Sequence, residues 1–344
     1  MKRNKIIIGT RGSKLALWQA EWVKSELIKI DPSLHIELNR IKTTGDKIID
    51  VPLANVGGKG LFVKEIEEAL LQCTADIAVH SMKDVPTEFP EGLHLSVICK
   101  REDPRDAFLT RIHDNTFQIP DFNSLPEGAI IGTSSLRRSC QLLNIRPDLK
   151  IAQLRGNLDT RIRKLDEKQY DAIILAVAGV TRLGWTNRIA DILSSAISLP
   201  AIGQGAIGIE CRADDTFINH LISKLNDEES ALCVRAERAF LKKLEGGCQV
   251  PIAAHARIEQ GSRDKAQIAH TAGSGPRTSK SGILVMDGLV GSISGDRIIR
   301  EHAEGTVEDF ESIGIELATA LLAKGANRIL KEVYGTSIGK IDVP

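Results

Sequence analysis

The sequence predicts an α/β protein with two similar α/β domains joined by a hinge and a smaller α+β domain at the C-terminal end. Its 344 residues are enough for more than one domain. In the first two thirds of the chain, short apolar strands alternate with amphipathic helices, a pattern typical of βα units around a largely parallel sheet. A strand that runs into Gly-Thr and a capped helix occurs twice, at residues 7–10 and 130–133, and this weak repeat favours two related domains.

Charge and composition exclude several classes of protein. Lysine plus arginine and aspartate plus glutamate number 45 each, so the net charge gives no basis for nonspecific binding to nucleic acid or to a membrane surface. No apolar run approaches the roughly 18 residues of a membrane helix, and the run at 6–8 is too short for a secretion signal. The six cysteines lie far apart without zinc-ligand spacing, which indicates reduced thiols in the cytoplasm and no metal site.

The first domain is predicted from alternating strands and helices. Residues 5–8 form a strand and Ser13 caps the following helix, so Arg11 lies at a strand-to-helix turn. Residues 44–60 are rich in glycine and show little periodicity, which predicts a mobile loop. Further elements are a strand at 35–41, a helix at 63–72 and a strand at 76–79. The last strand delivers residues 80–84 to its carboxyl end.

A comparable pattern predicts the second domain. Residues 130–132 form a strand, Ser134 or Ser135 caps the next helix, and a helix at 158–168 leads into a strand at 172–177. Two polar segments with proline are predicted to cross between the domains, at residues 100–106 and 199–205. The expected boundaries are 1–103 with 201–224 for the first domain and 104–200 for the second.

The organisation changes after residue 225, which predicts a third domain at 225–344. A helix from about residue 227 has Phe240 on its apolar face and ends at Gly246 and Gly247. Alternating strands follow at 250–258 and after residue 283, and one long helix is expected over about 307–331. The polar segment 260–282 between the strands is expected to be a mobile excursion.

Basic side chains collect at strand ends and helix starts, where parallel βα units place their ligands. The second domain contributes Arg137, Arg138, Arg155, Arg161 and Arg182, and the first contributes Arg11 and Lys83 from the opposite side. Seven cations in such places predict a ligand with several carboxylates or phosphates. The alternative is that each is a solvated charge at a helix end.

Two further residues have alternatives that the local sequence leaves open. Asp84 could transfer protons or stabilise a developing cation, or it could be a turn aspartate before Pro86. Cys248 follows two glycines and is expected on an accessible loop, yet a small buried thiol is the commoner case. A cysteine nucleophile with His255 as its base is a third possibility.

Six motifs in order along nearly the whole chain carry a family resemblance. They are IGTRGSKLA at 8–16, VGGKGLF at 56–62, HSMKDVP at 80–86, GTSSLRR at 132–138, LRGN at 154–157 and EGGC at 245–248. Together they resemble the porphobilinogen deaminase family, also called hydroxymethylbilane synthases. The resemblance implies that the first two domains are similar to periplasmic binding proteins.

The resemblance also implies a cofactor and a site. The cofactor is dipyrromethane, made from two substrate units and joined to Cys248 through a thioether, and Asp84 is the catalytic carboxylate. The other residues that contact the cofactor are Lys83, Asp84, Thr133, Ser135, Arg137, Arg138, Arg161 and Ala176. Those that contact the substrate are Arg11, Ser13, Gln19, Arg155, Arg182 and Phe62, with Phe62 beside the predicted loop lid.

The implied reaction joins four porphobilinogen molecules head to tail with loss of ammonia, and hydrolysis then releases hydroxymethylbilane. Asp84 would interact with pyrrole N–H groups and stabilise the cationic azafulvene. The family implies a cytoplasmic monomer without nucleic-acid or membrane partners. The competing hypothesis is a non-catalytic anion-binding protein, and a cysteine-dependent acyl transferase is a further alternative.

Overall fold

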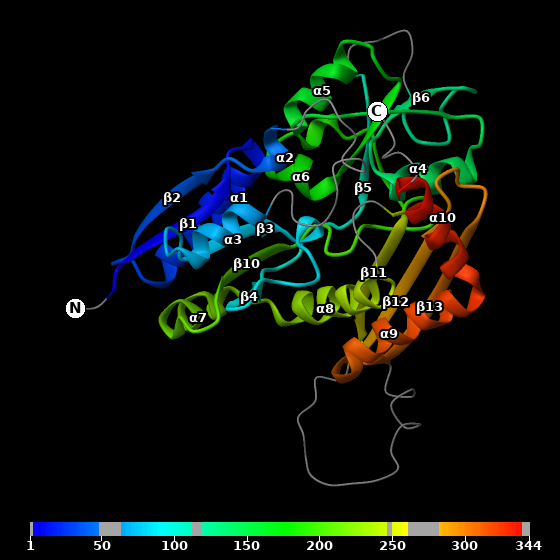
Figure 1. Ribbon diagram of the computed structural model, residues 1–344. Helices are drawn as coiled ribbons and strands as arrows, with labels where there is room; N and C mark the ends of the chain where they lie inside the picture. The colour runs from blue at the N-terminus through cyan, green and yellow to red at the C-terminus, as the bar shows by residue number, and fades with distance from the viewer. Residues whose placement is uncertain (1–2, 48–62, 112–118, 246–249, 261–281, 339–344) are drawn as a thin grey trace, which may run out of the picture.

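The computed structural model describes residues 3–47, 63–111, 119–245, 250–260 and 282–338. These segments form two α/β bodies and a third body in which helices cover an antiparallel sheet (Figure 1). This is the fold class that the sequence predicts.

The first α/β body is built on a five-stranded sheet with the order β2-β1-β3-β10-β4. The strands β1, β2 and β3 are parallel, whereas β10 is antiparallel to both β3 and β4. The strands are β1 (Lys5–Arg11), β2 (His35–Ile41), β3 (Ile77–Ser81), β4 (Leu93–Ile98) and β10 (Ile207–Arg212). Its helices are α1 (Lys14–Ile30), α2 (Thr44–Lys47), α3 (Lys64–Leu71) and α7 (Thr216–Ile222), with short turns η2 (Met82–Asp84) and η4 (Ser223–Leu225).

The second body repeats this topology, with the order β7-β6-β8-β5-β9. Here β6 is parallel to β7 and β8, and β5 is antiparallel to β8 and β9. Its strands are β5 (Asp106–Thr110), β6 (Ile130–Gly132), β7 (Lys150–Ala152), β8 (Ala172–Ala176) and β9 (Asp191–Leu193). Its helices are α4 (Leu136–Ile145), α5 (Leu158–Asp166) and α6 (Val177–Arg182), with the turn η3 (Thr186–Arg188). The predicted repeat is therefore real, although each sheet is mixed rather than largely parallel.

The helix starts follow the predicted capping in part. Ser13 is the N-cap of α1, and its hydroxyl accepts a hydrogen bond from the Ala16 amide at 3.3 Å. Ser135 is the N-cap residue of α4, but its side chain makes no capping hydrogen bond. The neighbouring Ser134 instead contacts the backbone of Leu154 in both directions, as donor at 2.9 Å and as acceptor at 3.0 Å.

The third body packs helices on one face of the sheet β11-β12-β13. Its core combines Phe240, Leu317 and Leu321 from helices with apolar residues of the strands, because period-two alternation points one side of each strand at the helices. Its strands are β11 (Ile252–Gln260), β12 (Gly282–Gly291) and β13 (Ile298–Thr306). Its helices are α8 (Glu228–Lys243), α9 (Phe310–Leu321) and α10 (Asn327–Ile338), with the short segments η5 (Val307–Asp309) and η6 (Leu322–Ala326).

The prediction of one long helix over 307–331 is wrong. Helix α9 ends at Leu321 and α10 begins at Asn327, with a kink at Gly325 between them. Gly325 has φ of 102°, in the left-handed region that favours glycine and ends a regular helix. The apolar period continues across the kink, so it could not reveal the break.

A buried carboxylate of α8 holds the two crossing segments together. Glu237 has no solvent exposure and pairs with Arg101 of the first crossing, with Oε1 2.6 Å from Nη1. It also accepts from the Gly203 amide of the return crossing at 2.7 Å and from the Ala256 amide of β11 at 2.9 Å. Arg101 in turn donates to the Gln204 carbonyl at 2.8 Å. The third body therefore fastens both segments that connect the α/β bodies.

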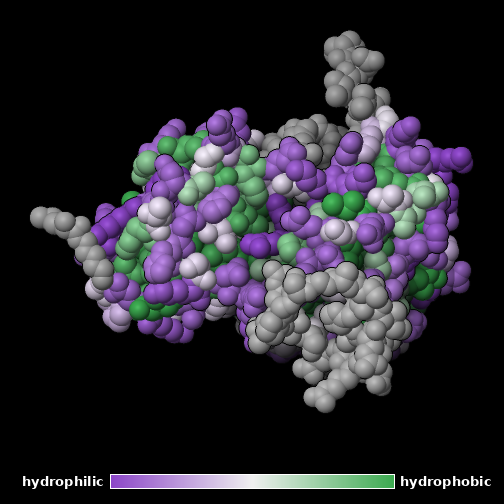
Figure 2. All heavy atoms as spheres, turned by 90° about the horizontal axis from the view of Figure 1, so that it is seen from below, coloured by the Kyte–Doolittle hydropathy of each residue, from purple (hydrophilic) through white to green (hydrophobic). Residues whose placement is uncertain are grey.

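Surface hydropathy gives no large apolar face in the view from below, where hydrophobic residues lie in separate patches among hydrophilic ones (Figure 2). Within the described residues, no helix has the length and apolar character needed to span a membrane.

We expect Glu237→Gln to lower the free energy of unfolding by about 3–5 kcal/mol, because it leaves the buried Arg101 guanidinium without its counter-charge. Urea unfolding followed by far-UV circular dichroism measures this change. Glu229→Gln is the matched control, since Glu229 is an exposed carboxylate on the same helix. Equal midpoints for the two variants would contradict the assigned role of Glu237.

Candidate functional site

The turn that follows β3 presents Lys83 and Asp84 at the junction of the two α/β bodies. Strand β3 ends at Ser81, and the single 3₁₀ turn Met82–Asp84 follows. Met82 is buried, Lys83 is half-buried and Asp84 is exposed. A strand end followed by a tight turn therefore projects both charged side chains out of the first body, as the sequence predicts.

The charges that act on the Lys83 ammonium group come from both α/β bodies. The pKa of Lys83 is lowered to about 8, chiefly by burial and also by the positive charges of Arg138 and Arg137, while the negative charges of Asp84 and Asp106 oppose the shift. Arg138 and Asp106 belong to the second body. The two bodies therefore bring their charged strand and helix ends within electrostatic reach of each other.

The other predicted residues of the first body fall into two groups. Arg11 is the last residue of β1 and is partly buried, and Ser13 follows it as the helix cap. Gln19 is only 2% exposed, and its amide exchanges hydrogen bonds with the Ser81 hydroxyl at 2.9 and 3.1 Å. Gln19 thus supports the strand end before Lys83, and its predicted contact with substrate stays a prediction.

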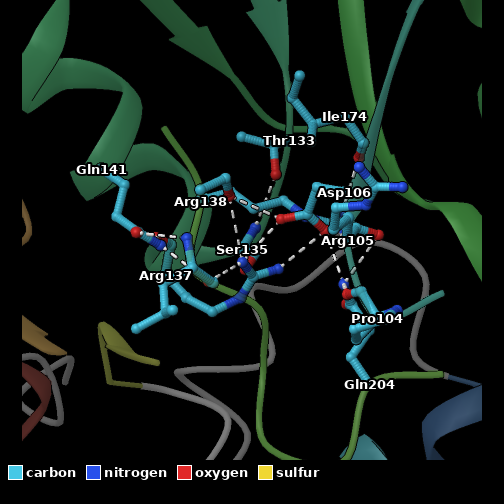
Figure 3. Close-up of polar contacts among 12 residues, drawn as sticks. Pro104, Arg105, Asp106, Thr133, Ser135, Arg137, Arg138, Gln141, Ile174 and Gln204 are labelled. Carbon is cyan, nitrogen blue, oxygen red and sulfur yellow. Dashed lines mark hydrogen bonds and ion pairs between the residues drawn. The ribbon is translucent and has the colours of Figure 1, made fainter. Parts of the chain in front are cut away.

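Arg137 and Arg138 share the buried carboxylate of Asp106 (Figure 3). Arg137 Nη1 lies 2.7 Å from Asp106 Oδ2 and also donates to the Leu199 carbonyl at 2.8 Å. Arg138 Nη2 lies 2.8 Å from Asp106 Oδ1, and its Nη1 donates to the Ile174 carbonyl at 2.8 Å. Burial alone would raise the pKa of Asp106, but the two guanidinium charges outweigh burial and hold this pKa far below its usual range.

This arrangement revises the prediction for the arginine pair. Both guanidinium groups are about 5% exposed, and most of their donors are used within the protein. The three charges together still leave a buried excess of one positive charge. Gln204 of the return crossing adds a donor to Asp106 at 2.9 Å, so this cluster is also tied to the hinge. Asp106 and Gln204 were missed because they carry no motif and meet the arginines only in the tertiary structure.

Three smaller predicted residues line the same part of the second body. Thr133 is buried, and its hydroxyl accepts from the Ser135 amide at 3.2 Å. Ser135 precedes α4 and is partly exposed. Ala176 is the last residue of β8 and pairs with Asp106 of β5, so it offers backbone groups rather than side-chain chemistry. Thr133 and Ser135 thus lie at the start of the helix that carries the arginine pair, and Ala176 is paired with the strand residue that binds both arginines.

Arg161 points back toward the start of its own helix α5. Its Nε donates to the Gly156 carbonyl at 2.7 Å. The pKa of Arg161 is lowered to about 10, chiefly by burial and also by Arg138 and Arg155, while Asp84 opposes the shift. Arg161 is therefore charged at neutral pH and lies within electrostatic reach of Asp84 in the first body. Arg155, which is partly buried, adds charge to the same region.

Arg182 makes contacts between the two α/β bodies. It is 9% exposed, donates to the Gly205 carbonyl at 2.7 Å and lies 5.7 Å above the Trp18 ring of α1. Its position at the end of α6 therefore connects the second body to the first and to the return crossing. Its predicted contact with substrate stays a prediction.

Two predicted residues, Phe62 and Cys248, lie outside the described residues, as do residues 48–60 of the expected lid and 261–281 of the expected excursion. The loop prediction is wrong at its start, where residues 44–47 form helix α2. His255, the possible base for a cysteine nucleophile, is partly buried in β11, and burial lowers its pKa. Among the described residues, no cluster of histidine, cysteine and carboxylate side chains fits a metal ion.

Taken together, the described geometry defines a class: two topologically matched α/β domains with a cationic site at their junction and a third domain fastened to the hinge. The family model "Porphobilinogen deaminase, dipyromethane cofactor binding domain" matches residues 6–220, and "Porphobilinogen deaminase, C-terminal domain" matches residues 231–323. The chain belongs to the porphobilinogen deaminase family, transferases that polymerise porphobilinogen to hydroxymethylbilane in tetrapyrrole biosynthesis.

Curated relatives agree over nearly the full length. Porphobilinogen deaminase of Geobacter sulfurreducens is 53% identical over 99% of this chain and 98% of the relative. That of Pelobacter propionicus is 52% identical over 98% of this chain and 100% of the relative. Among solved structures, the VFT2 domain of BvgS from Bordetella pertussis is 16% identical with a TM-score of 0.38, over 65% of this chain and 87% of that one. That last likeness is too low to support any argument.

We expect Lys83 to titrate near pH 8 in the folded protein before the cofactor is attached, below the ordinary lysine value. Because Asp84 raises this pKa, Asp84→Asn should lower it further. The measurement is an NMR pH titration of lysine side chains labelled with ¹³C in the cofactor-free protein, with Lys83→Arg identifying the signal. A midpoint above 10 in the cofactor-free protein would show that the ammonium group is not desolvated as the packing indicates.

Proposed function

We propose that Asp84 is the catalytic carboxylate of this transferase and that Cys248 holds its dipyrromethane cofactor through a thioether. The observation that supports this most is the juxtaposition at the domain junction. The turn with Lys83 and Asp84 lies within electrostatic reach of Arg138 and Arg161 from the second domain. A lone exposed carboxylate among cations is positioned to act on a cationic centre held there by its own carboxylates.

The donors at the junction fit a dipyrromethane chemically. Each pyrrole unit carries an acetate and a propionate, so the group is a polycarboxylate, and Lys83 and Arg161 are charged donors at neutral pH. We propose that these two, with Ser135 and Thr133 at the helix start, hold the cofactor carboxylates, and that the backbone at Ala176 contacts the pyrroles. When bound, the group supplies the free pyrrole α-carbon at which the chain is extended.

For Arg137 and Arg138 we propose a mainly electrostatic role toward the cofactor. Their donors are largely occupied by Asp106 and by backbone carbonyls. Their shared excess of positive charge is buried and weakly screened, so it attracts carboxylates without a full bidentate contact. The donors that remain on each guanidinium can still complete a hydrogen bond to the ligand.

For the substrate we propose Arg11 and Arg155 as the main carboxylate contacts. Arg11 lies at the end of a central strand of the first domain, and Arg155 precedes the α5 start in the second. Ser13 can donate its hydroxyl proton while accepting from Ala16. Arg182 would join them only if its contacts with Gly205 and Trp18 open. Phe62 is proposed to pack beside the bound pyrroles.

The chemistry of Asp84 follows from its charge and exposure. Its carboxylate can accept hydrogen bonds from the pyrrole N–H groups of substrate. As the protonated amino group leaves as ammonia, positive charge develops on the substrate ring, and the negative charge of Asp84 stabilises it. The same carboxylate can then take up the proton that is released when the new carbon–carbon bond is complete.

We also propose the domain boundaries, the location and the assembly state. The first domain comprises residues 1–103 and 201–224, the second 104–200 and the third 225–344. The sheet assignment of β5 and β10 supports the two crossings that these boundaries need. The free cysteines of the described residues suit a reducing cytoplasm, and the family resemblance favours a monomer.

We expect Asp84→Asn to keep its cofactor but to lose turnover by about 100-fold or more, because the shape is retained while the stabilising charge is removed. Ammonia release from porphobilinogen under saturating substrate measures turnover, and intact mass verifies the cofactor. Glu88→Gln, which changes an exposed carboxylate just beyond the turn, is the control. Wild-type turnover in loaded Asp84→Asn would exclude the catalytic role.

We expect Cys248→Ser to fold without the covalent adduct, since a serine hydroxyl cannot form the thioether. The denatured wild-type chain should weigh two pyrrole units more than its sequence mass, and the variant should match its sequence mass. Cys73→Ser, at an exposed thiol, should retain the adduct. An adduct that persists in Cys248→Ser would move the anchor to another residue.

A further inference from the structure

The turn that carries Lys83 and Asp84 has little internal support. It is a three-residue 3₁₀ turn with a single backbone bond, from the Val85 amide to the Met82 carbonyl at 3.2 Å. Pro86 follows and has no N–H to donate. The carbonyls of Val85 and Pro86 therefore need partners from another part of the chain.

Arg238 of α8 supplies those partners. Its Nη1 donates to the Val85 carbonyl at 3.1 Å, and its Nη2 donates to the Pro86 carbonyl at 2.6 Å. The guanidinium also lies 5.7 Å from the centre of the Phe89 ring, beyond the same turn. A planar fork that engages two successive carbonyls fixes both the position and the orientation of the backbone.

The partners of the Arg238 guanidinium are neutral carbonyl groups and not a carboxylate. Within the described part of the chain it forms no ion pair with a carboxylate, and burial lowers its pKa to about 10. Desolvating a guanidinium to bind two neutral carbonyls is unfavourable in itself. What it gains is a fixed backbone at Val85 and Pro86, the two residues directly after Asp84. A displacement of a catalytic group by about 1 Å can strongly reduce the rate of the reaction.

The packing around the turn shows the same restraint from the third domain. Met82 and Val85 share a buried cluster with Ala231 and Val234 of α8. On the opposite side, Gly203 adopts φ of 69° and approaches Met82 so closely that a Cβ there would lie 2.8 Å from the Met82 Cβ. The turn is therefore enclosed between α8 and the return crossing.

From these contacts we infer that Arg238 is a positioning residue, which holds the turn that carries Lys83 and Asp84 in place at the domain junction. The inference rests on the proposed function, because the turn matters for turnover only if Asp84 is the catalytic carboxylate. Helix α8 ends at Lys243, and the proposed anchor Cys248 lies five residues further along the sequence. Through Arg238, helix α8 fixes the backbone of the turn directly after Asp84.

The test compares Arg238→Gln with Arg238→Lys in the loaded enzyme. Arg238→Gln should lower kcat about 10-fold or more with KM changed less than 3-fold and with the adduct intact by mass. Amide hydrogen exchange of the peptide 81–86 should be at least 10-fold faster, while exchange in β1 is unchanged. Arg238→Lys, which keeps a donor and the charge, should recover part of both effects.

Arg235→Gln is the matched control, since Arg235 is an exposed arginine on the same helix. Wild-type exchange of residues 81–86 in Arg238→Gln would overturn the inference, and so would wild-type kcat in the loaded variant. If Arg238→Gln does not fold, Arg238→Lys must still show faster exchange in 81–86 than Arg235→Gln, and its absence would equally overturn the inference. The exchange measurement does not depend on the chemistry of Asp84, so failure of the proposed function would appear separately, as full turnover in Asp84→Asn.

Discussion

The buried carboxylate of Glu237 is the interaction on which the arrangement of the three domains depends. A fully buried charge is stable only when its oxygen atoms are all engaged, and Glu237 meets this condition with the Arg101 guanidinium and two backbone amides. Those partners come from the first crossing, the return crossing and β11. The connections between the α/β domains are therefore fixed at one place on α8, and the site at the domain junction is built around that fixed place.

The junction of the two α/β domains carries a local excess of positive charge, although the chain as a whole has no net charge. Positive side chains end up near one another because strand ends and helix starts of both α/β domains meet there. Asp106 neutralises only one of the two positive charges of Arg137 and Arg138. Because it pairs with both, it reduces their mutual repulsion enough for both to be buried. The low dielectric that lowers the Lys83 pKa also strengthens the attraction of the remaining cations for a ligand with several carboxylates.

The proposed anchor Cys248 and the proposed catalytic turn at Asp84 are far apart in the sequence, so their relative position is a tertiary property. Helix α8 links them through consecutive residues, with Glu237 on the crossings and Arg238 on the turn. Neighbouring positions on a helix point about 100° apart, which lets one helix hold two different segments. Through α8, the third domain therefore contacts both the crossing segments and the turn at the junction of the other two domains.

The sequence by itself determined the fold class and part of its elements. Local periodicity and capping signals located β1, α1 and the strand that ends before Lys83, and the repeated Gly-Thr turn predicted two related sheets. Motifs also determined the family and the candidate site residues, because their residue types are explicit in the chain.

Only the tertiary structure decided which of those residues are free to meet a ligand. Gln19 and Arg182 carry suitable groups, yet packing directs them to Ser81 and to Gly205. Arg137 and Arg138 are adjacent in the chain, but their partner Asp106 is 31 and 32 positions away, and Glu237 is 136 positions from Arg101. The kink at Gly325 was missed for a related reason, since an apolar period reports which face is buried and not whether the helix is continuous. Patterns in a sequence are local, whereas burial and charge pairing depend on segments that meet only when the chain has folded.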